Sequence, residues 1–89
     1  MHFEWDRKKA ESNLGKHDVS FDEAATVFFD MLSATIPDPD HSIGERRFLT
    51  MGMSSKGRLL VVAHVEAATA LRIISARPAS ASERNRYET

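Results

Sequence analysis

The first half of the chain carries apolar residues at the spacing of amphipathic helices. Asp6 can cap a first helix, which we expect to end near Gly15 to His17, and the preceding Met1 to Trp5 is expected to form a short edge strand. Ser20 and Glu23 form a capping box that predicts the start of a second helix. Ala10, Asn13, Leu14 and His17 fall on one face of the first helix. The expected buried stripe of the second helix consists of Phe21, Ala24, Ala25, Phe28 and Leu32.

The second half changes to the alternating pattern of β-strands. Three strands are predicted, and the short segments between them imply an antiparallel meander. The middle strand is apolar on both sides, so we expect it at the centre of the sheet. The predicted strands run from Arg47 to Met53, from Leu59 to Val65 and from Leu71 to Ala76.

Prolines indicate where the regular elements stop. Ile36 to Ser42 includes two prolines, which remove backbone donors, and is expected to be a surface loop. Pro78 is expected to end the third strand, and Ser80 with Glu83 forms a capping box for a helix that runs through Tyr87. The predicted order β-α-α-β-β-β-α is an α+β layout, with an antiparallel sheet core packed by helices, in one domain over residues 1–89.

The composition is that of a globular protein and excludes several kinds of site. Hydrophobic residues make up 42% and charged residues 28%, and the absence of cysteine rules out disulfides and thiolate chemistry. The four histidines lack metal-ligand spacing, so we expect neither a metal nor a cofactor. No apolar run is long enough to cross a membrane, and the charged start differs from a signal peptide, so the cytoplasm is the expected compartment.

Charge is divided unevenly along the chain, whose formal net charge is −1. Residues 1–45 carry four basic and ten acidic groups, a balance of −6, whereas residues 46–89 carry eight basic and three acidic groups, a balance of +5. Seven of the eight basic groups in the second half are arginines, whose planar guanidinium suits phosphate. This asymmetry indicates an anionic partner for the second half.

Basic and histidine side chains on the predicted sheet suit metal-free cleavage of RNA. That reaction needs a base for the 2′-hydroxyl proton, cations around the phosphate and an acid for the leaving oxygen. His64, His17 or Glu66 can serve as base or acid, and Tyr87 can stack on a nucleobase or donate a proton. The candidate cations are Arg46, Arg47, Arg72 and Arg77.

The expected geometry depends on the turn between the second and third predicted strands. A turn centred on Ala68 places His64 directly opposite Arg72, at about 4.5–5.5 Å between Cβ atoms. Arg72 and Arg77 differ in parity, so they lie on opposite faces unless the strand twists or bulges. Plainer interpretations stay open, because an arginine on a strand is more often a solvated surface residue, and His17 is more often a histidine that bonds to the last carbonyls of its helix.

Several blocks of sequence are more specific together than any single motif. They are Phe3-Glu4-Trp5-Asp6, Lys9-Ala10, Asn13-Leu14, Lys16-His17, Val19-Ser20-Phe21, Glu23-Ala24-Ala25, Val27-Phe28, Glu45-Arg46-Arg47, Gly52-Met53-Ser54, Leu59-Leu60-Val61-Val62, Arg72-Ile73-Ile74-Ser75-Ala76-Arg77, Ala79, Glu83 and Tyr87. In this order, over essentially the whole chain, they resemble the BrnT toxin family.

The resemblance implies a RelE-like fold and the toxin of a type II toxin–antitoxin system, a ribonuclease that inhibits translation by cutting RNA. It also implies a BrnA-type antitoxin whose ribbon-helix-helix part binds operator DNA, so that the complex represses its own operon. By position, the resemblance implies roles for Lys16, His17, Arg46, Arg47, Arg72, Arg77, Glu83 and Tyr87. Together with His64, these give catalytic candidates His64, Arg72, Arg77, His17 and Tyr87, and RNA-binding candidates Lys16, Arg46, Arg47 and Glu83.

Three positions depart from the family pattern. Asp18 stands where a glycine commonly follows the Lys-His pair, Pro78 replaces what is often a basic residue, and the turn from Ala67 to Ala70 lacks the charged residues often found there. These departures leave open a second function, a catalytically weak toxin-like module that acts mainly through its antitoxin complex in transcriptional repression. A small interaction domain that binds no nucleic acid is a third alternative.

Overall fold

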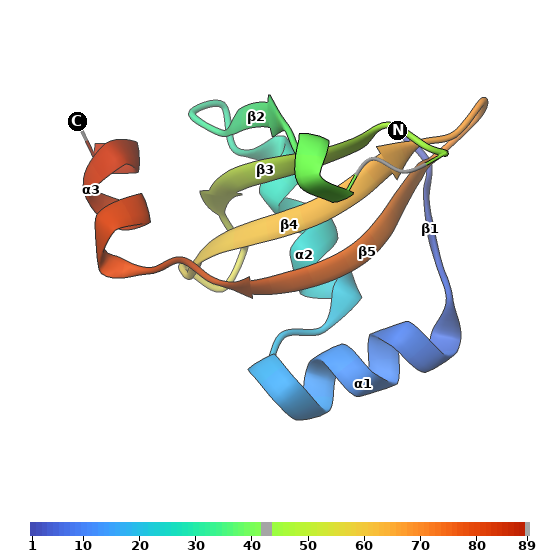
Figure 1. Ribbon diagram of the computed structural model, residues 1–89. Helices are drawn as coiled ribbons and strands as arrows, with labels where there is room; N and C mark the ends of the chain where they lie inside the picture. The colour runs from blue at the N-terminus through green and yellow to red at the C-terminus, as the bar shows by residue number, and fades with distance from the viewer. Residues whose placement is uncertain (42–43, 89) are drawn as a thin grey trace.

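The computed structural model describes residues 1–41 and 44–88 and shows helices packed against one mixed sheet (Figure 1). The expected α+β class is confirmed. The expected order of elements is wrong in one respect, since an additional strand precedes the three predicted ones. The elements are β1 (Phe3–Trp5), α1 (Arg7–His17), α2 (Phe21–Thr26), the 3-10 helix η1 (Val27–Phe29), β2 (Ala34–Pro37), the 3-10 helix η2 (Pro39–His41), β3 (Arg47–Met53), β4 (Leu59–Glu66), β5 (Leu71–Pro78) and α3 (Ala81–Glu88).

The sheet has the strand order β1-β5-β4-β3-β2. β1 runs parallel to β5, whereas the other neighbouring strands pair antiparallel. The predicted meander, the edge position of β1 and the central position of β4 are confirmed. β3 has the predicted bounds, while β4 extends to Glu66 and β5 to Pro78.

The expectation of a surface loop over Ile36 to Ser42 is wrong for its first residues. Ile36 and Pro37 belong to β2, which pairs with β3. Proline is tolerated here because β2 is the outer strand of the sheet, where one side of the backbone has no neighbouring strand to bond. Pro39–His41 form a short 3-10 helix, and Ser42 lies outside the described residues.

The core lies between the sheet and the helices α1 and α2 (Figure 1). Alternate residues of β4 point to this side, so Leu60 and Val62 are fully buried. They belong to one cluster with Ile73 and Ala76 of β5. Each buried Leu, Ile, Val or Phe side chain contributes about 1.5–3 kcal/mol through the removal of apolar surface from water. The helical side of the cluster consists of Val19, Phe21, Ala24 and Val27.

A buried polar side chain attaches α1 to β5. The Asn13 amide nitrogen donates to the carbonyl oxygens of Val19 at 3.0 Å and Ala76 at 2.8 Å, and its amide oxygen accepts from the Ala76 N–H at 3.0 Å. Of the four residues that share the predicted face of α1, Leu14 and His17 are exposed. The bonds of Asn13 set the rotation of α1 and turn Leu14 outward, and His17 is the last helical residue.

α2 begins at the predicted cap, where Ser20 Oγ accepts from the Glu23 N–H at 3.0 Å. The buried Glu23 carboxylate accepts from Ser54 Oγ at 2.7 Å and from Arg58 Nε at 2.9 Å, which ties α2 to the β3–β4 connection. The hydrogen bond from Arg58 is the main cause of the lowered pKa of Glu23. The helical segment ends before Leu32, which is 74% exposed, so its predicted place in the buried stripe is wrong.

α3 begins with a complete capping box, as predicted. Ser80 Oγ accepts from the Glu83 N–H at 3.3 Å, and the Glu83 carboxylate accepts from the Ser80 N–H at 2.8 Å. Figure 1 shows α3 beyond the end of β5, and none of its described residues is buried. Within residues 1–41 and 44–88, no helix is long and apolar enough to span a membrane.

Candidate active site

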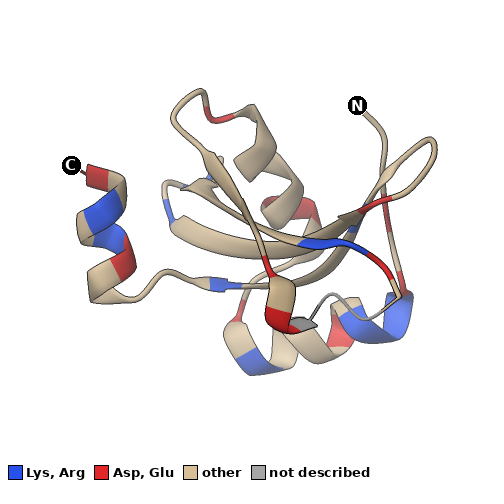
Figure 2. Ribbon diagram, turned by 45° about the horizontal axis from the view of Figure 1, so that its top comes forward, with Lys and Arg blue, Asp and Glu red and all other residues tan. Residues whose placement is uncertain are grey.

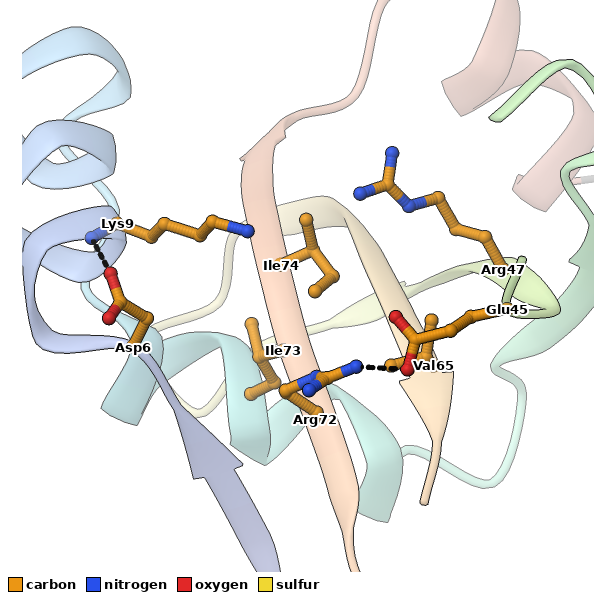
Figure 3. A pocket seen from close by; sticks show the side chains of 8 residues that line it. All are labelled: Asp6, Lys9, Glu45, Arg47, Val65, Arg72, Ile73 and Ile74. Carbon is orange, nitrogen blue, oxygen red and sulfur yellow. Dashed lines mark hydrogen bonds and ion pairs between the residues drawn. The ribbon is translucent and has the colours of Figure 1, made fainter. Parts of the chain in front are cut away.

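A cleft of about 420 Å³ lies where β1 ends and α1 begins. Lys9 comes from the start of α1 and Arg72 comes from β5. Arg47 is the first residue of β3, and Glu45 lies two residues before it. Figure 3 shows Lys9 and Arg47 reaching over Ile74 from opposite sides, with Glu45 and Arg72 beside them. Three elements that are distant in sequence therefore direct charged side chains into one space.

Helix capping positions Lys9 at this cleft. Asp6 Oδ2 accepts from the Lys9 N–H at 3.0 Å, which satisfies a free backbone donor in the first turn of α1. Trp5 ends β1 and Asp6 is the cap, so the chain passes from the sheet edge into the helix within one residue. Lys9 belongs to the acidic half of the sequence, yet it joins arginines of the basic half.

The charges that line the cleft are mainly positive. Lys9, Arg47 and Arg72 face the carboxylates of Glu45 and Asp6, a formal balance of +1. Arg72 donates through Nη2 to the Glu45 carboxylate, and these side chains are 34% and 63% exposed, respectively. Arg72 Nε is buried and has no hydrogen-bond partner among the described residues. Figure 2 shows the basic starts of α1 and β3 on the same side of the molecule.

A β-bulge in β5 determines which arginines share a face of the sheet. The pairing with β4 shifts between Ala63 and His64, so Ile74 is an additional residue in β5. Arg72 and Arg77 consequently point to the same side, which is the exception that the parity argument allowed. Their partners on β4 are four residues apart, a separation of roughly 13 Å at ~3.3 Å per residue, which is too large for parallel side chains to hold one phosphate.

Arg77 and Glu83 belong to a second cluster, where α3 joins the sheet. Arg77 donates to both Glu83 carboxylate oxygens, at 2.8 and 2.9 Å. This contact is the main cause that lowers the pKa of Glu83 to about 2 and raises the pKa of Arg77. The Tyr87 hydroxyl donates to the Asp30 carboxylate, which raises the pKa of Tyr87. Three predicted site residues thus attach α3.

The predicted pairing of His64 with Arg72 is wrong. The Ala67 N–H donates to the Ala70 carbonyl at 2.8 Å, so the turn is centred between Ala68 and Thr69 and not on Ala68. His64 therefore pairs with Ile73, and Arg72 is shifted by one position. A slip of one residue moves a side chain to the other face, and the His64 ring points to the core side.

Burial gives the His64 side chain a structural environment. It is 2% exposed, its ring stacks on Phe48 with centroids 5.9 Å apart, and its Nε2 lies 2.7 Å from Thr50 Oγ1. Burial lowers the pKa of His64 to about 4, so the ring is neutral at pH 7. Its Nδ1 is buried with no hydrogen-bond partner among the described residues. The ring therefore has no access to the cleft.

The other predicted residues lie outside the cleft. Lys16 and His17 are exposed at the C-terminal end of α1, about 10–12 Å along the helix from Lys9 at ~1.5 Å per residue. Arg46 lies over the ring of Phe48, with its guanidinium carbon 5.4 Å from the centroid. The structure thus brings Arg47 and Arg72 together in the cleft and joins Arg77 with Glu83 at the start of α3, while the remaining candidates lie elsewhere.

The likeness of this chain to known proteins extends over most of its length. The family model described as "Ribonuclease toxin, BrnT, of type II toxin-antitoxin system" matches residues 5–83. The chain belongs to the BrnT family. The resemblance inferred from the sequence is thereby confirmed. None of the curated proteins matches the sequence significantly.

A solved BrnT structure has a similar fold. The crystal structure of the Brucella abortus ribonuclease toxin BrnT matches with a TM-score of 0.71 and 23% sequence identity, over 90% of this chain and 97% of that chain. At this identity the likeness concerns the fold. The residues that match the BrnT family model include Lys9, Glu45 and Arg72 and end before Tyr87.

The structure gives a local explanation for one of the expected departures from the BrnT pattern. Asp18 adopts the left-handed conformation, with φ 56°, and its N–H donates to the Leu14 carbonyl at 2.9 Å. This is the helix end at which glycine is favoured, so Asp18 fills the position at some conformational cost. Pro78, another expected departure, is the last residue of β5, and nothing in the structure explains its choice over a basic residue.

Lys9 and Glu45 are the cleft residues of this BrnT chain that sequence reasoning missed as site candidates. Two signals pointed to them, since Lys9 stands three residues after the helix cap and Glu45 directly precedes Arg46 and Arg47. Among residues 1–41 and 44–88, no group of three or more His, Asp or Glu side chains is placed to hold a metal ion.

Proposed function

We propose that this protein is a metal-independent endoribonuclease, the toxin of its type II toxin–antitoxin system, and that RNA is cut at the cleft where α1 begins. The supporting observation is the convergence of Lys9, Arg47 and Arg72 in a chain of the BrnT family. Ammonium and guanidinium groups can balance the charge that builds up on a phosphate during cleavage. The side chains can therefore supply this stabilisation without a metal ion.

The predicted residues take different parts in this proposal. Arg72 holds the scissile phosphate, while Arg46, Lys16 and His17 contact flanking phosphates of a bound single strand. Arg77 and Glu83, with Tyr87, hold α3 in place, and Arg77 also adds positive charge beside the bound strand. His64 supports the sheet from the core side and takes no part in proton transfer, because its ring is 2% exposed.

The partner in this proposal is a BrnA-type antitoxin with a ribbon-helix-helix part. It neutralises the toxin by binding over the cleft, and the complex reaches operator DNA through the antitoxin and represses its own operon. Membership of a type II toxin–antitoxin family supports the existence of such a partner. The proposed place of action is the cytoplasm, where the RNA that is translated lies.

RNA cleavage by the purified protein tests the proposed activity. Expression without antitoxin is expected to stop growth, and purified protein is expected to cut RNA in the presence of EDTA. Arg72→Ala should lower the cleavage rate by at least about 100-fold, because a positioned charge on the phosphate is lost. Arg7→Ala is the matched control, since Arg7 is 93% exposed and pairs with Glu11 outside the cleft. RNA that stays intact would contradict the proposal.

A catalytically weak binding module is the second candidate. It is favoured by the ion pairs of Arg72 with Glu45 and of Arg77 with Glu83, which occupy both arginines within the chain itself. Harmless expression, intact RNA and tight binding to the antitoxin would support this candidate over the first.

A further inference from the structure

We propose that Glu45 is the catalytic group that accepts the 2′-hydroxyl proton during RNA cleavage, and that Lys9 returns a proton to the leaving 5′-oxygen. This inference rests on the proposed ribonuclease function and assigns the proton transfers at its site. It differs from the sequence-based candidates, which placed these transfers on His64, His17 or Glu66.

Glu45 lies against the arginine that is proposed to hold the scissile phosphate. Its carboxylate accepts from Arg72 Nη2, and its side chain is 63% exposed. An exposed ion pair contributes little to stability, so an incoming phosphate can replace the carboxylate at Arg72 at small cost. The displaced carboxylate remains beside that phosphate, because Glu45 is only two residues from Arg47, where β3 begins, and the strand holds its backbone close to the cleft. It is then within reach of the 2′-hydroxyl of the ribose that carries the phosphate.

The other groups that line the cleft are unsuited to accept this proton. Asp6 Oδ2 already accepts the Lys9 N–H at 3.0 Å as the helix cap. Arg47 and Arg72 carry guanidinium groups, which stay protonated in proteins. Among the residues that line the cleft, this leaves Glu45 as the base and the Lys9 ammonium as a proton donor. Figure 3 shows these two side chains on opposite walls of the cleft.

The histidines cannot replace them from their positions in the structure. His64 is 2% exposed on the core side of the sheet. His17 lies about 12 Å along α1 from Lys9, at ~1.5 Å per residue. Neither residue lines the cleft.

The proposed step balances without a metal, an oxidant or a water molecule. Glu45 takes the proton of the 2′-hydroxyl, and the 2′-oxygen forms a bond to phosphorus. The bond from phosphorus to the 5′-oxygen breaks, and that oxygen takes a proton from the Lys9 ammonium. The products are a 2′,3′-cyclic phosphate and a 5′-hydroxyl end. After the reaction, the Glu45 carboxylic acid releases its proton to water, and the neutral Lys9 amine takes up a proton from water.

Glu45→Gln separates a catalytic role from a binding role. We expect kcat to fall by at least about 100-fold, because glutamine cannot accept the proton. We expect KM to stay the same or fall, because the competing carboxylate no longer occupies Arg72. Glu45→Asp should recover part of kcat, and Glu11→Gln, at a 68% exposed position outside the cleft, should change neither constant.

The outcomes distinguish this inference from the proposed function. A wild type that cuts RNA together with a Glu45→Gln variant that cuts at the same rate would overturn the role of Glu45 and leave the ribonuclease function intact. A wild type that does not cut RNA would overturn both. A fall in kcat that comes with an equal loss of RNA binding would also count against proton transfer. Circular dichroism and the melting temperature verify that each variant is folded.

An RNA with sulfur in place of the leaving 5′-oxygen tests Lys9. A thiolate leaves without protonation, so Lys9→Ala should be slow on normal RNA and restored to within about tenfold of the wild type on the sulfur substrate. Glu45→Gln should remain slow on both substrates, because the 2′-hydroxyl must still lose its proton. Failure of the sulfur substrate to restore Lys9→Ala would refute the role of Lys9 as the acid.

Discussion

His64 couples the stability of the protein to pH. Its folded-state pKa is about 4, because its ring is buried, whereas a histidine in an unfolded chain titrates near ~6.5. Between these values the unfolded chain binds more protons than the folded one, so stability falls as pH falls. The contribution of His64 to the free energy of unfolding is fully present above about pH 6.5 and is lost by about pH 4. The difference between the folded-state and unfolded-state pKa values corresponds to about 3 kcal/mol.

Replacement of His64 by glutamine should remove this dependence. Glutamine can keep the hydrogen bond to Thr50 but does not titrate. Between pH 7 and pH 4, we expect the wild type to lose about 3 kcal/mol more unfolding free energy than His64→Gln, as measured by urea denaturation. The variant should cut RNA at a rate similar to the wild type at pH 7. If the unfolding free energies of the wild type and His64→Gln fall equally with pH, His64 does not cause the pH dependence. A folded His64→Gln variant that does not cut RNA would contradict its structural role.

The position of His64 also shows where sequence reasoning ends at the scale of single residues. Ala67 and Ala70 close the turn by a backbone hydrogen bond, and no side chain in the sequence indicates where that bond forms. Ile74 is apolar like its neighbours, so the bulge it creates leaves no trace in the hydrophobic pattern. The face of Arg72 relative to Arg77 could therefore be stated as conditional on a bulge, but the bulge itself could not be predicted.

At the scale of elements, α3 depends on polar contacts for its place. None of its described residues is buried, and it is held by the pairs Arg77–Glu83 and Asp30–Tyr87. Tyr87→Phe removes the second pair. We expect amide exchange in the last turns of α3 to rise about tenfold, because one hydrogen bond to a charged group contributes about 1.5 kcal/mol.

The rest of the molecule should be unaffected by Tyr87→Phe. The unfolding midpoint should change little, because the α3 contacts lie outside the core. Arg84→Ala is the matched control, since its ion pair with Glu88 lies within α3. Unchanged exchange in α3, measured by NMR, would show that the Asp30 contact does not hold the helix.

Elements with strong local signals could be predicted, and β2 could not. The caps at Asp6, Ser20 and Ser80 are side-chain to backbone bonds between residues close in sequence, and all are present. The alternating pattern located β3, β4 and β5 almost to the residue. β2 forms because it can pair with the otherwise unpaired edge of β3, and that edge exists only in the folded sheet. Taken alone, Pro37 disfavours a strand.

At the scale of the whole molecule, the division of charge along the sequence is only partly a division in space. The cleft joins Lys9 and Glu45 from the acidic half with Arg47 and Arg72 from the basic half. The sequence therefore indicated arginines of the sheet as a site for an anion, but the participation of α1 required the fold. The resulting site carries both a carboxylate and several cations.

Salt dependence of RNA binding tests how many of these cations meet phosphate. For a single strand, each neutralised phosphate contributes about 0.7 to the slope of log affinity against log salt concentration. Lys9, Arg47 and Arg72 together therefore contribute about −2 to the slope, and the flanking contacts proposed for Arg46 and Lys16 make it steeper. Arg72→Ala should reduce its magnitude by about 0.7, while Arg7→Ala, outside the cleft, should leave it unchanged. Binding is measured with an RNA that lacks the 2′-hydroxyl at the cleavage position, so that the strand stays intact. A slope near zero would mean that the cleft does not bind the phosphate backbone, and an Arg72→Ala slope equal to that of the wild type would remove Arg72 from the contact.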